Sequence, residues 1–125
     1  MSKLPKPTPA ELELLHLLWR MGPSTAKAVH LEASREREIG AANVLRLLQI
    51  MHGKGLVTRD ESQRSHVYAA VQAPETTRRS LLGDFITRAF KGSGKDLVMA
   101  ALKGGHVTEA ERQEIEAFLR GEDGK

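Results

Sequence analysis

The chain has 125 residues, of which 40% are apolar and 28% charged, the composition of a folded domain rather than of a disordered or collagen-like chain. It has no cysteine, which excludes a disulfide framework and a cysteine nucleophile, and it has no apolar run long enough to span a membrane. The net charge is +3, and all of the excess lies in residues 1–73, which carry ten Lys and Arg against seven Asp and Glu. A normally solvated surface accounts for this mild excess, and phosphate contact in the first half needs further support from the order of the elements. The first seven residues lack the apolar stretch of a signal peptide, so we expect a cytoplasmic protein.

The first half begins with two helical patterns. Three prolines in the first nine residues predict an extended tail over 1–7. Thr8 and Glu11 fit a capping box that opens a helix at Pro9, and Gly22-Pro23 ends it. Its apolar face consists of Leu12, Leu14, Leu15, Leu18, Trp19 and Met21. Ser24 or Thr25 then caps a short helix to about residue 33, whose inward side consists of Ala26, Val29 and Leu31.

A third helix is expected from residue 40 to about residue 52. Its buried stripe, at helical spacing, consists of Val44, Leu47, Leu48 and Met51. The glycines at 53 and 55 end the helix. Two strands are expected at 56–59 and 66–71, joined by a polar connection.

Three helices followed by a hairpin, within about 65 residues, are typical of a winged helix-turn-helix, whose third helix enters the major groove of DNA. The expected fold is mainly α with a small β-hairpin. It comprises a DNA-binding domain at 8–73, a helical dimerisation domain at 74–120, and flexible tails at 1–7 and 121–125. No acidic residue lies between Gly40 and Gly55. Asn43 and Gln49 could pair with adenine and Arg46 with guanine. The basic residues Lys54, Arg59 and Arg64 are expected to hold phosphates. The candidate DNA-binding residues are Ala42, Asn43, Arg46, Gln49, Lys54, Arg59, Arg64 and His66.

The second half contains three short amphipathic helices. Glycines at 92–94 and 104–105 separate them, and a capping box at Thr108 opens the last one. About 50 residues are too few to close a good core, so a second copy is expected to cover their apolar sides. The alternative is that these helices fold back onto their own winged domain. The candidate dimer residues are Leu81, Leu82, Phe85, Ile86, Phe90, Leu97, Val98, Ile115, Phe118 and Leu119.

The sequence resembles the penicillinase-repressor family, the BlaI/MecI-type transcriptional repressors, over about residues 8–120. The resemblance is carried by the segments 9–19, 43–51, 54–57, 66–71 and 85–98, and by the capping box at Thr108. It implies a homodimeric repressor that binds a palindromic operator in double-stranded DNA. Three residues depart from the family pattern on the reading helix: Asn43 stands where Thr is usual, Arg46 where a small hydroxyl is usual, and Ile50 where Arg is frequent.

The resemblance does not carry over a known inactivation mechanism. Ala100-Ala101 stands where the β-lactam-responsive branch has a cleavable Asn-Phe bond, so an upstream sensor or protease is left unidentified. The five histidines form no zinc-binding spacing, and Gly92–Lys95 lacks the spacing of a phosphate-binding loop. We therefore expect no enzyme activity, metal or cofactor. The alternative function is a winged-helix module that binds protein without sequence-specific DNA binding, because the third helix has few basic residues.

Overall fold

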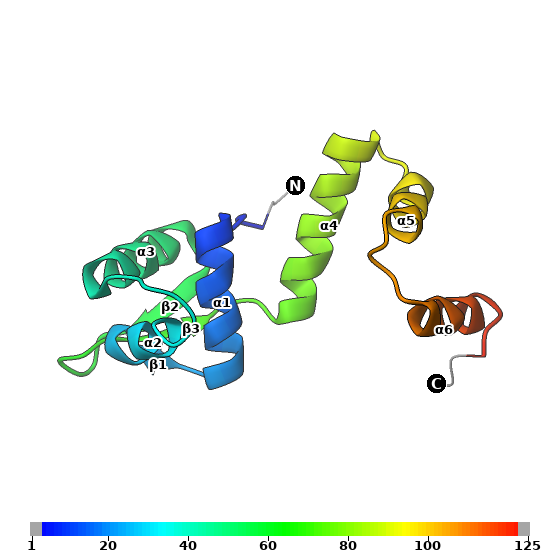
Figure 1. The fold of residues 1–125 in the computed structure, drawn as a ribbon. Helices are drawn as coiled ribbons and strands as arrows, with labels where there is room; N and C mark the ends of the chain where they lie inside the picture. The colour runs from blue at the N-terminus through cyan, green and yellow to red at the C-terminus, as the bar shows by residue number, and fades with distance from the viewer. Residues whose placement is uncertain (1–3, 123–125) are drawn as a thin grey trace. The chain divides into compact units, whose positions relative to one another are not determined.

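The computed structural model describes residues 4–122 and divides the chain between Leu81 and Leu82 into two compact units (Figure 1). The first unit contains α1 (Pro9–Met21), β1 (Ser24–Thr25), α2 (Ala26–Ala33), α3 (Ala41–Lys54), β2 (Val57–Asp60) and β3 (Val67–Ala70). The helix α4 (Pro74–Phe90) begins in the first unit and ends in the second. The second unit continues with α5 (Gly94–Lys103) and α6 (Glu109–Leu119). This is the expected winged-helix order followed by a helical segment.

The core of the first unit lies between α1, α2, α3 and the sheet. The expected stripe of α3 is confirmed, because Val44, Leu47, Leu48 and Met51 are all buried. Helix α1 contributes four buried leucines to this core. One of them, Leu17, was not among the residues predicted for its apolar face. The other buried apolar residues are Val29, Ala33, Leu56, Val57 and Tyr68. Leu31 was expected to face inward, but it is 58% exposed, since Val29 and Ala33 define the buried side of this short helix.

The sheet has three antiparallel strands in the order β1-β3-β2, one more than the expected hairpin. The additional strand is Ser24–Thr25, which pairs with Tyr68 and Val67 of β3. A strand of two residues is too short to show the alternation of apolar and polar residues by which a strand is predicted from sequence. Thr25 is also the N-cap of α2, where its hydroxyl accepts a hydrogen bond from the amide of Ala28. The wing strand β3 therefore pairs with the segment before α2 as well as with β2.

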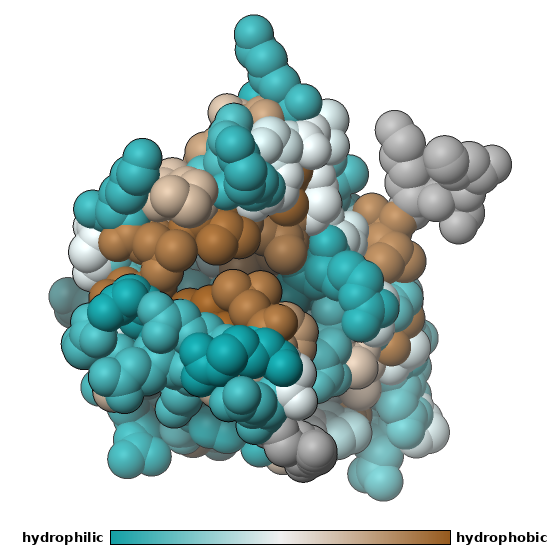
Figure 2. All heavy atoms as spheres, turned by 90° about the vertical axis from the view of Figure 1, so that its right-hand side faces the viewer, coloured by the Kyte–Doolittle hydropathy of each residue, from teal (hydrophilic) through white to brown (hydrophobic). Residues whose placement is uncertain are grey.

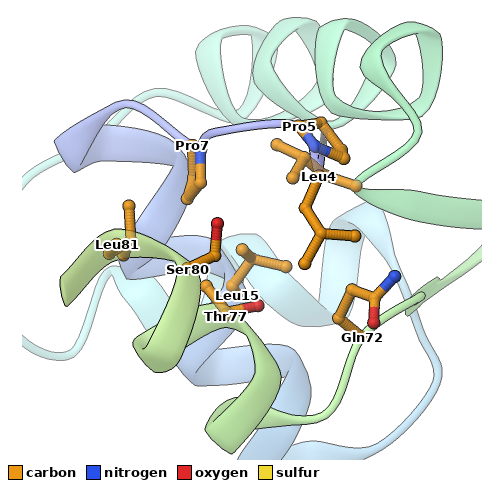
Figure 3. A pocket seen from close by; sticks show the side chains of 9 residues that line it. Leu4, Pro5, Pro7, Leu15, Gln72, Thr77, Ser80 and Leu81 are labelled. Carbon is orange, nitrogen blue, oxygen red and sulfur yellow. The ribbon is translucent and has the colours of Figure 1, made fainter. Parts of the chain in front are cut away.

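The first two turns of α4 pack with the winged domain, so the first compact unit extends beyond the expected boundary at Pro74. Thr77 is buried, and Leu81, expected at the dimer face, lines a small cavity in the first unit. The cavity, of about 10 Å³, has room for a single water molecule (Figure 3). Its wall consists of Leu4, Pro5, Pro7, Leu15, Leu56, Gln72, Thr77, Ser80 and Leu81. Residues 4–7 of the expected tail are thus half-buried, whereas residues 1–3 and 123–125 lie outside the described part of the chain.

The sole tryptophan anchors the connection that leads into α4. Its indole Nε1 donates a hydrogen bond to the backbone carbonyl of Gln72, at 2.9 Å. The Trp19 ring also packs on the core as a partly buried residue. Trp19 therefore links α1 to the segment between β3 and α4, and its fluorescence reports on the folding of the first unit.

Glu11 is a buried carboxylate that joins two helices. In the capping box of α1 its Oε1 accepts from the amide of Thr8, at 2.9 Å, as expected from the sequence. The same oxygen accepts from Nζ of Lys54 at the end of α3, at 2.6 Å. Burial acts to raise the pKa of Glu11, but the hydrogen bonds from Lys54 and Thr8 outweigh it and hold this pKa below 4.5. The charged pair thus ties the end of α3 to the beginning of α1.

Glu11→Gln is expected to lower the free energy of unfolding near neutral pH by about 1–3 kcal/mol, because glutamine keeps the capping box but not the charge opposite Lys54. The native pKa of Glu11 lies below its unfolded value. Its contribution is therefore fully present above the unfolded pKa and is lost as pH falls through the folded pKa. Urea unfolding followed by Trp19 fluorescence should show the difference from wild type shrinking with acidification.

Glu13→Gln is the matched control for this experiment. Glu13 lies two residues away and its side chain is 57% exposed, paired with Arg37 at the surface. Loss of an exposed pair costs at most about 1 kcal/mol. Equal losses in the two variants would contradict the structural role assigned to Glu11.

Candidate nucleic-acid interface

The exposed face of α3 has the composition of a base-reading surface. With its apolar stripe buried, the helix leaves Ala42, Asn43, Arg46 and Gln49 exposed. Nη2 of Arg46 donates to Oδ1 of Asn43 at 2.6 Å, so the two candidate readers lie together one turn apart. The helix contains no Asp or Glu. Nothing on α3 itself would repel a phosphate backbone.

The beginning of α3 also favours an anion. Gly40 is its N-cap and supplies no side-chain hydrogen bond to the first turn. The first amides of a helix lack intrahelical partners and carry the positive end of the helix dipole. These amides are therefore available to a phosphate oxygen beside Ala42 and Asn43. At the other end Gly55 adopts the left-handed conformation, with φ of 85°, that stops the helix before β2.

The wing presents its expected basic residues differently. Arg64 is exposed in the connection between β2 and β3, and His66, directly before β3, is half-buried. Nε of Arg59 donates to a carboxylate oxygen of Glu61 at 2.6 Å. Hydrogen bonding with Tyr68 and then with Glu61 raises the pKa of Arg59 above its ordinary value. Arg59 thus stays charged but already has partners within the wing.

A groove joins the wing to α3 and to the beginning of α2. Its volume is about 320 Å³, and its wall consists of Thr25, Ala26, Lys27, Leu45, Gln49, Arg64, Ser65, His66 and Tyr68. Three of the expected residues, Gln49, Arg64 and His66, are brought together there from α3 and the wing. Lys27 and Leu45 were not among the expected site residues. The capping threonine before α2 was the only sequence signal that pointed to this end of the groove.

Comparison with known proteins now assigns the family. The model of the penicillinase repressor family matches residues 7–121, nearly the whole chain. The chain belongs to the penicillinase-repressor family. The resemblance stated from the sequence is thereby confirmed, and the family is one of DNA-binding transcriptional repressors rather than enzymes. Among curated protein sequences, none is significantly similar to this chain.

Two solved structures are similar to this chain, and one of them has a TM-score above 0.5. The transcriptional regulator Tm0710 from Thermotoga maritima is 14% identical, with a TM-score of 0.51, over 91% of this chain and 72% of that one. ZitR from Lactococcus lactis, solved as its E41A mutant, is 17% identical with a TM-score of 0.47, over 97% of this chain and 76% of that one. At such identity Tm0710 supports the winged-helix fold of this penicillinase-repressor family member and nothing finer.

Lys54 has a different surrounding from the other candidates in this repressor. Its ammonium lies against the buried carboxylate of Glu11, and its side chain is only 33% exposed. The sequence suggested a phosphate contact, but a contact with DNA would compete with this pair. Glu11 and Lys54 are 43 residues apart along the chain, so no local sequence pattern could predict this ion pair.

The C-terminal unit of this repressor has many exposed apolar side chains. Figure 2 views the molecule from the side of α5 and α6 and shows apolar residues gathered in a hollow. Between residues 82 and 122 no residue is buried. The large apolar residues left exposed there are Leu82, Phe85, Val98, Met99, Phe118 and Leu119. An open groove of about 230 Å³ lies between Phe85, Phe90, Leu97, Ala100, Ala101 and His106.

Residues 4–122 lack two other kinds of site. No helix in this range is long and apolar enough to cross a membrane. Within the same range no group of three or more histidine or acidic side chains is placed to hold a metal ion. The titratable residues of the first unit instead form pairs such as Arg20 with Glu32 and Arg37 with Glu13, both at 2.8 Å.

Proposed function

We propose that this chain is a homodimeric transcriptional repressor that reads a palindromic operator with α3 and contacts the flanking phosphates with its wing. The observation that carries the proposal is the exposed face of α3, which has no acidic residue and on which Nη2 of Arg46 lies 2.6 Å from Oδ1 of Asn43. Arg suits the O6 and N7 acceptors of guanine, and Asn and Gln suit adenine. Leu45 is exposed in the groove between α3 and the wing, where its side chain could contact a thymine methyl group.

The wing and the beginning of α2 would position the protein without reading bases. Arg64 and Lys27 line one groove with Gln49 and His66, so two cations approach the same duplex that α3 enters. Contacts of this kind fix the register on the phosphate backbone. The phosphate role of Lys54 stays a prediction, since Glu11 already holds its ammonium.

The dimer is supported by the second unit. A segment in which no described residue is buried has little stability of its own, because folding is driven by removing apolar surface from water. A second copy would cover Leu82, Phe85 and Val98 with the same residues of its own surface, as two-fold symmetry requires. Two reading helices about 34 Å apart would then meet two half-sites separated by one turn of DNA.

The salt dependence of binding tests the proposal. Fluorescence anisotropy with a duplex selected by the protein from random sequences should show affinity falling steeply with salt, because each neutralised phosphate releases condensed counterions. Arg64→Ala should lower the slope of log affinity against log salt by about 1 and weaken binding to selected and scrambled duplexes alike. Arg88→Ala, which removes an exposed arginine of the second unit, is the matched control.

The alternative, a winged-helix module that binds protein, predicts a different result in the same experiment. No duplex would then be enriched over the random pool, and affinity for mixed DNA would be weak at every salt concentration. That outcome would reject the proposed operator binding.

A further inference from the structure

The beginning of the reading helix has no anchor of its own. Gly40 caps α3 through its backbone alone, and the preceding residues 34–39 form a turn and an irregular segment. A helix that reads base edges must nevertheless keep its first turn in one place, because hydrogen bonds weaken steeply beyond about 3.2 Å or when bent. Whatever holds residue 39 therefore sets where Asn43 and Arg46 lie.

His30 of α2 holds that residue. Its ring atom Nε2 lies 2.9 Å from the backbone carbonyl oxygen of Ile39, in a partly buried contact. A carbonyl oxygen can only accept, so Nε2 carries the hydrogen and His30 donates. The side chain of Ile39 also packs against the core of the first unit. The residue directly before the cap of α3 is thus fixed by one polar and one apolar contact.

The other end of α3 is fixed as well. Lys54, its last residue, donates to the buried Glu11 at 2.6 Å, and Glu11 is itself part of the capping box of α1. α3 is therefore held at its beginning by α2 and at its end by α1. Both contacts are polar and depend on direction. The packing of the buried apolar stripe of α3 between them does not depend on direction in this way.

We propose that His30, assisted by the Glu11–Lys54 pair, is a positioning residue that sets the placement of α3 in the major groove and so determines sequence discrimination. The inference rests on the proposed function. Base contacts depend on the orientation of a short rigid helix, whereas long cationic side chains still reach phosphates after a small shift. Loss of the His30 contact should therefore weaken operator binding and leave non-specific binding intact.

The experiment compares His30→Leu with His30→Gln in the full chain. Leucine removes the donor, whereas the amide nitrogen of glutamine can lie near the position of Nε2. Affinity is measured for the duplex that wild type selects from random sequences and for a scrambled duplex of equal composition. His30→Leu is expected to lose about fivefold in affinity for the selected duplex, the equivalent of one hydrogen bond. Its affinity for the scrambled duplex and its salt slope should not change, and His30→Gln should recover most of the loss.

His16→Leu is the control, because it makes the same substitution on α1, where the ring of His16 contacts the edge of Trp19. Should His30→Leu fail to fold, His30→Asn replaces it, since the shorter amide matches Nδ1 and cannot reach Ile39. The positioning role would be overturned if His30→Leu lost the same factor in affinity for the selected and the scrambled duplex. It would also be overturned if the Gln and Asn variants bound the selected duplex with equal affinity. If wild type selects no duplex at all, the proposed function itself fails, and that result is distinct from either of these.

Discussion

Arg46→Ala is expected to lower the affinity for the selected operator by about 1–3 kcal/mol, with little change for scrambled DNA. The guanidinium is exposed on an acid-free helix and held 2.6 Å from Oδ1 of Asn43, which orients it before DNA arrives. An oriented donor loses less side-chain entropy on binding. Arg46→Lys should recover little, because an ammonium cannot pair with guanine in the bidentate manner of a guanidinium. Anisotropy titrations of both duplexes measure the effect.

Arg20→Ala is the control for the loss of one arginine in the same unit. Arg20 lies on α1 and is paired with Glu32 at the surface, outside the groove between α3 and the wing. The reading assigned to Arg46 is wrong if its removal leaves the ratio of the two affinities unchanged. A fall on both duplexes, with a lower salt slope, would instead make Arg46 a phosphate contact.

Phe85→Asp is expected to convert the protein to a monomer and to abolish high-affinity operator binding. Phe85 is 53% exposed in the single chain and forms a T-shaped pair with Phe90, with ring centroids 5.8 Å apart. Covering an unpaired carboxylate in the proposed interface costs about 3–5 kcal/mol, equivalent to a rise of about a hundredfold to a few thousandfold in the dimer dissociation constant. Sedimentation equilibrium measures the association directly.

Thr87→Asp adds the same charge two residues further along α4, at an exposed polar position. It should leave the association intact, because residues two apart do not share a helix face. Circular dichroism should show whether the helices persist in Phe85→Asp. A dimer of unchanged affinity in Phe85→Asp would remove this residue from the interface, and a monomeric wild type would reject the dimer altogether.

The sequence predicted most of the fold because its signals were local. The stripe of α3, both capping boxes and the glycine at 55 depend on residues a few positions apart, and each occurs where expected. β1 escaped prediction because two residues show no period, and its partner Tyr68 lies far along the chain. The division inside α4 also depends on residues far apart along the chain, since the buried Thr77 lines a cavity together with Leu15 of α1 and with Leu4.

The candidate site divides in the same way. Helical spacing alone placed Asn43, Arg46 and Gln49 off the buried stripe, and all three are exposed. Spacing could not show that Glu11 holds Lys54, or that the wing carries its own acceptor for Arg59. Nor could it bring Lys27 into the groove, because Lys27 and the wing residues that line the groove lie far apart along the chain.

The amino-acid sequence by itself determined the order of the helices and of the two longer strands, the buried stripe of α3 and the family, since these follow from periodicity, capping residues and motifs along the chain. Tertiary structure alone decided which charged side chains are free to meet a ligand and which brace the helices. The physical reason is that hydrogen bonds and ion pairs act over a few ångströms in space, whatever the distance along the chain.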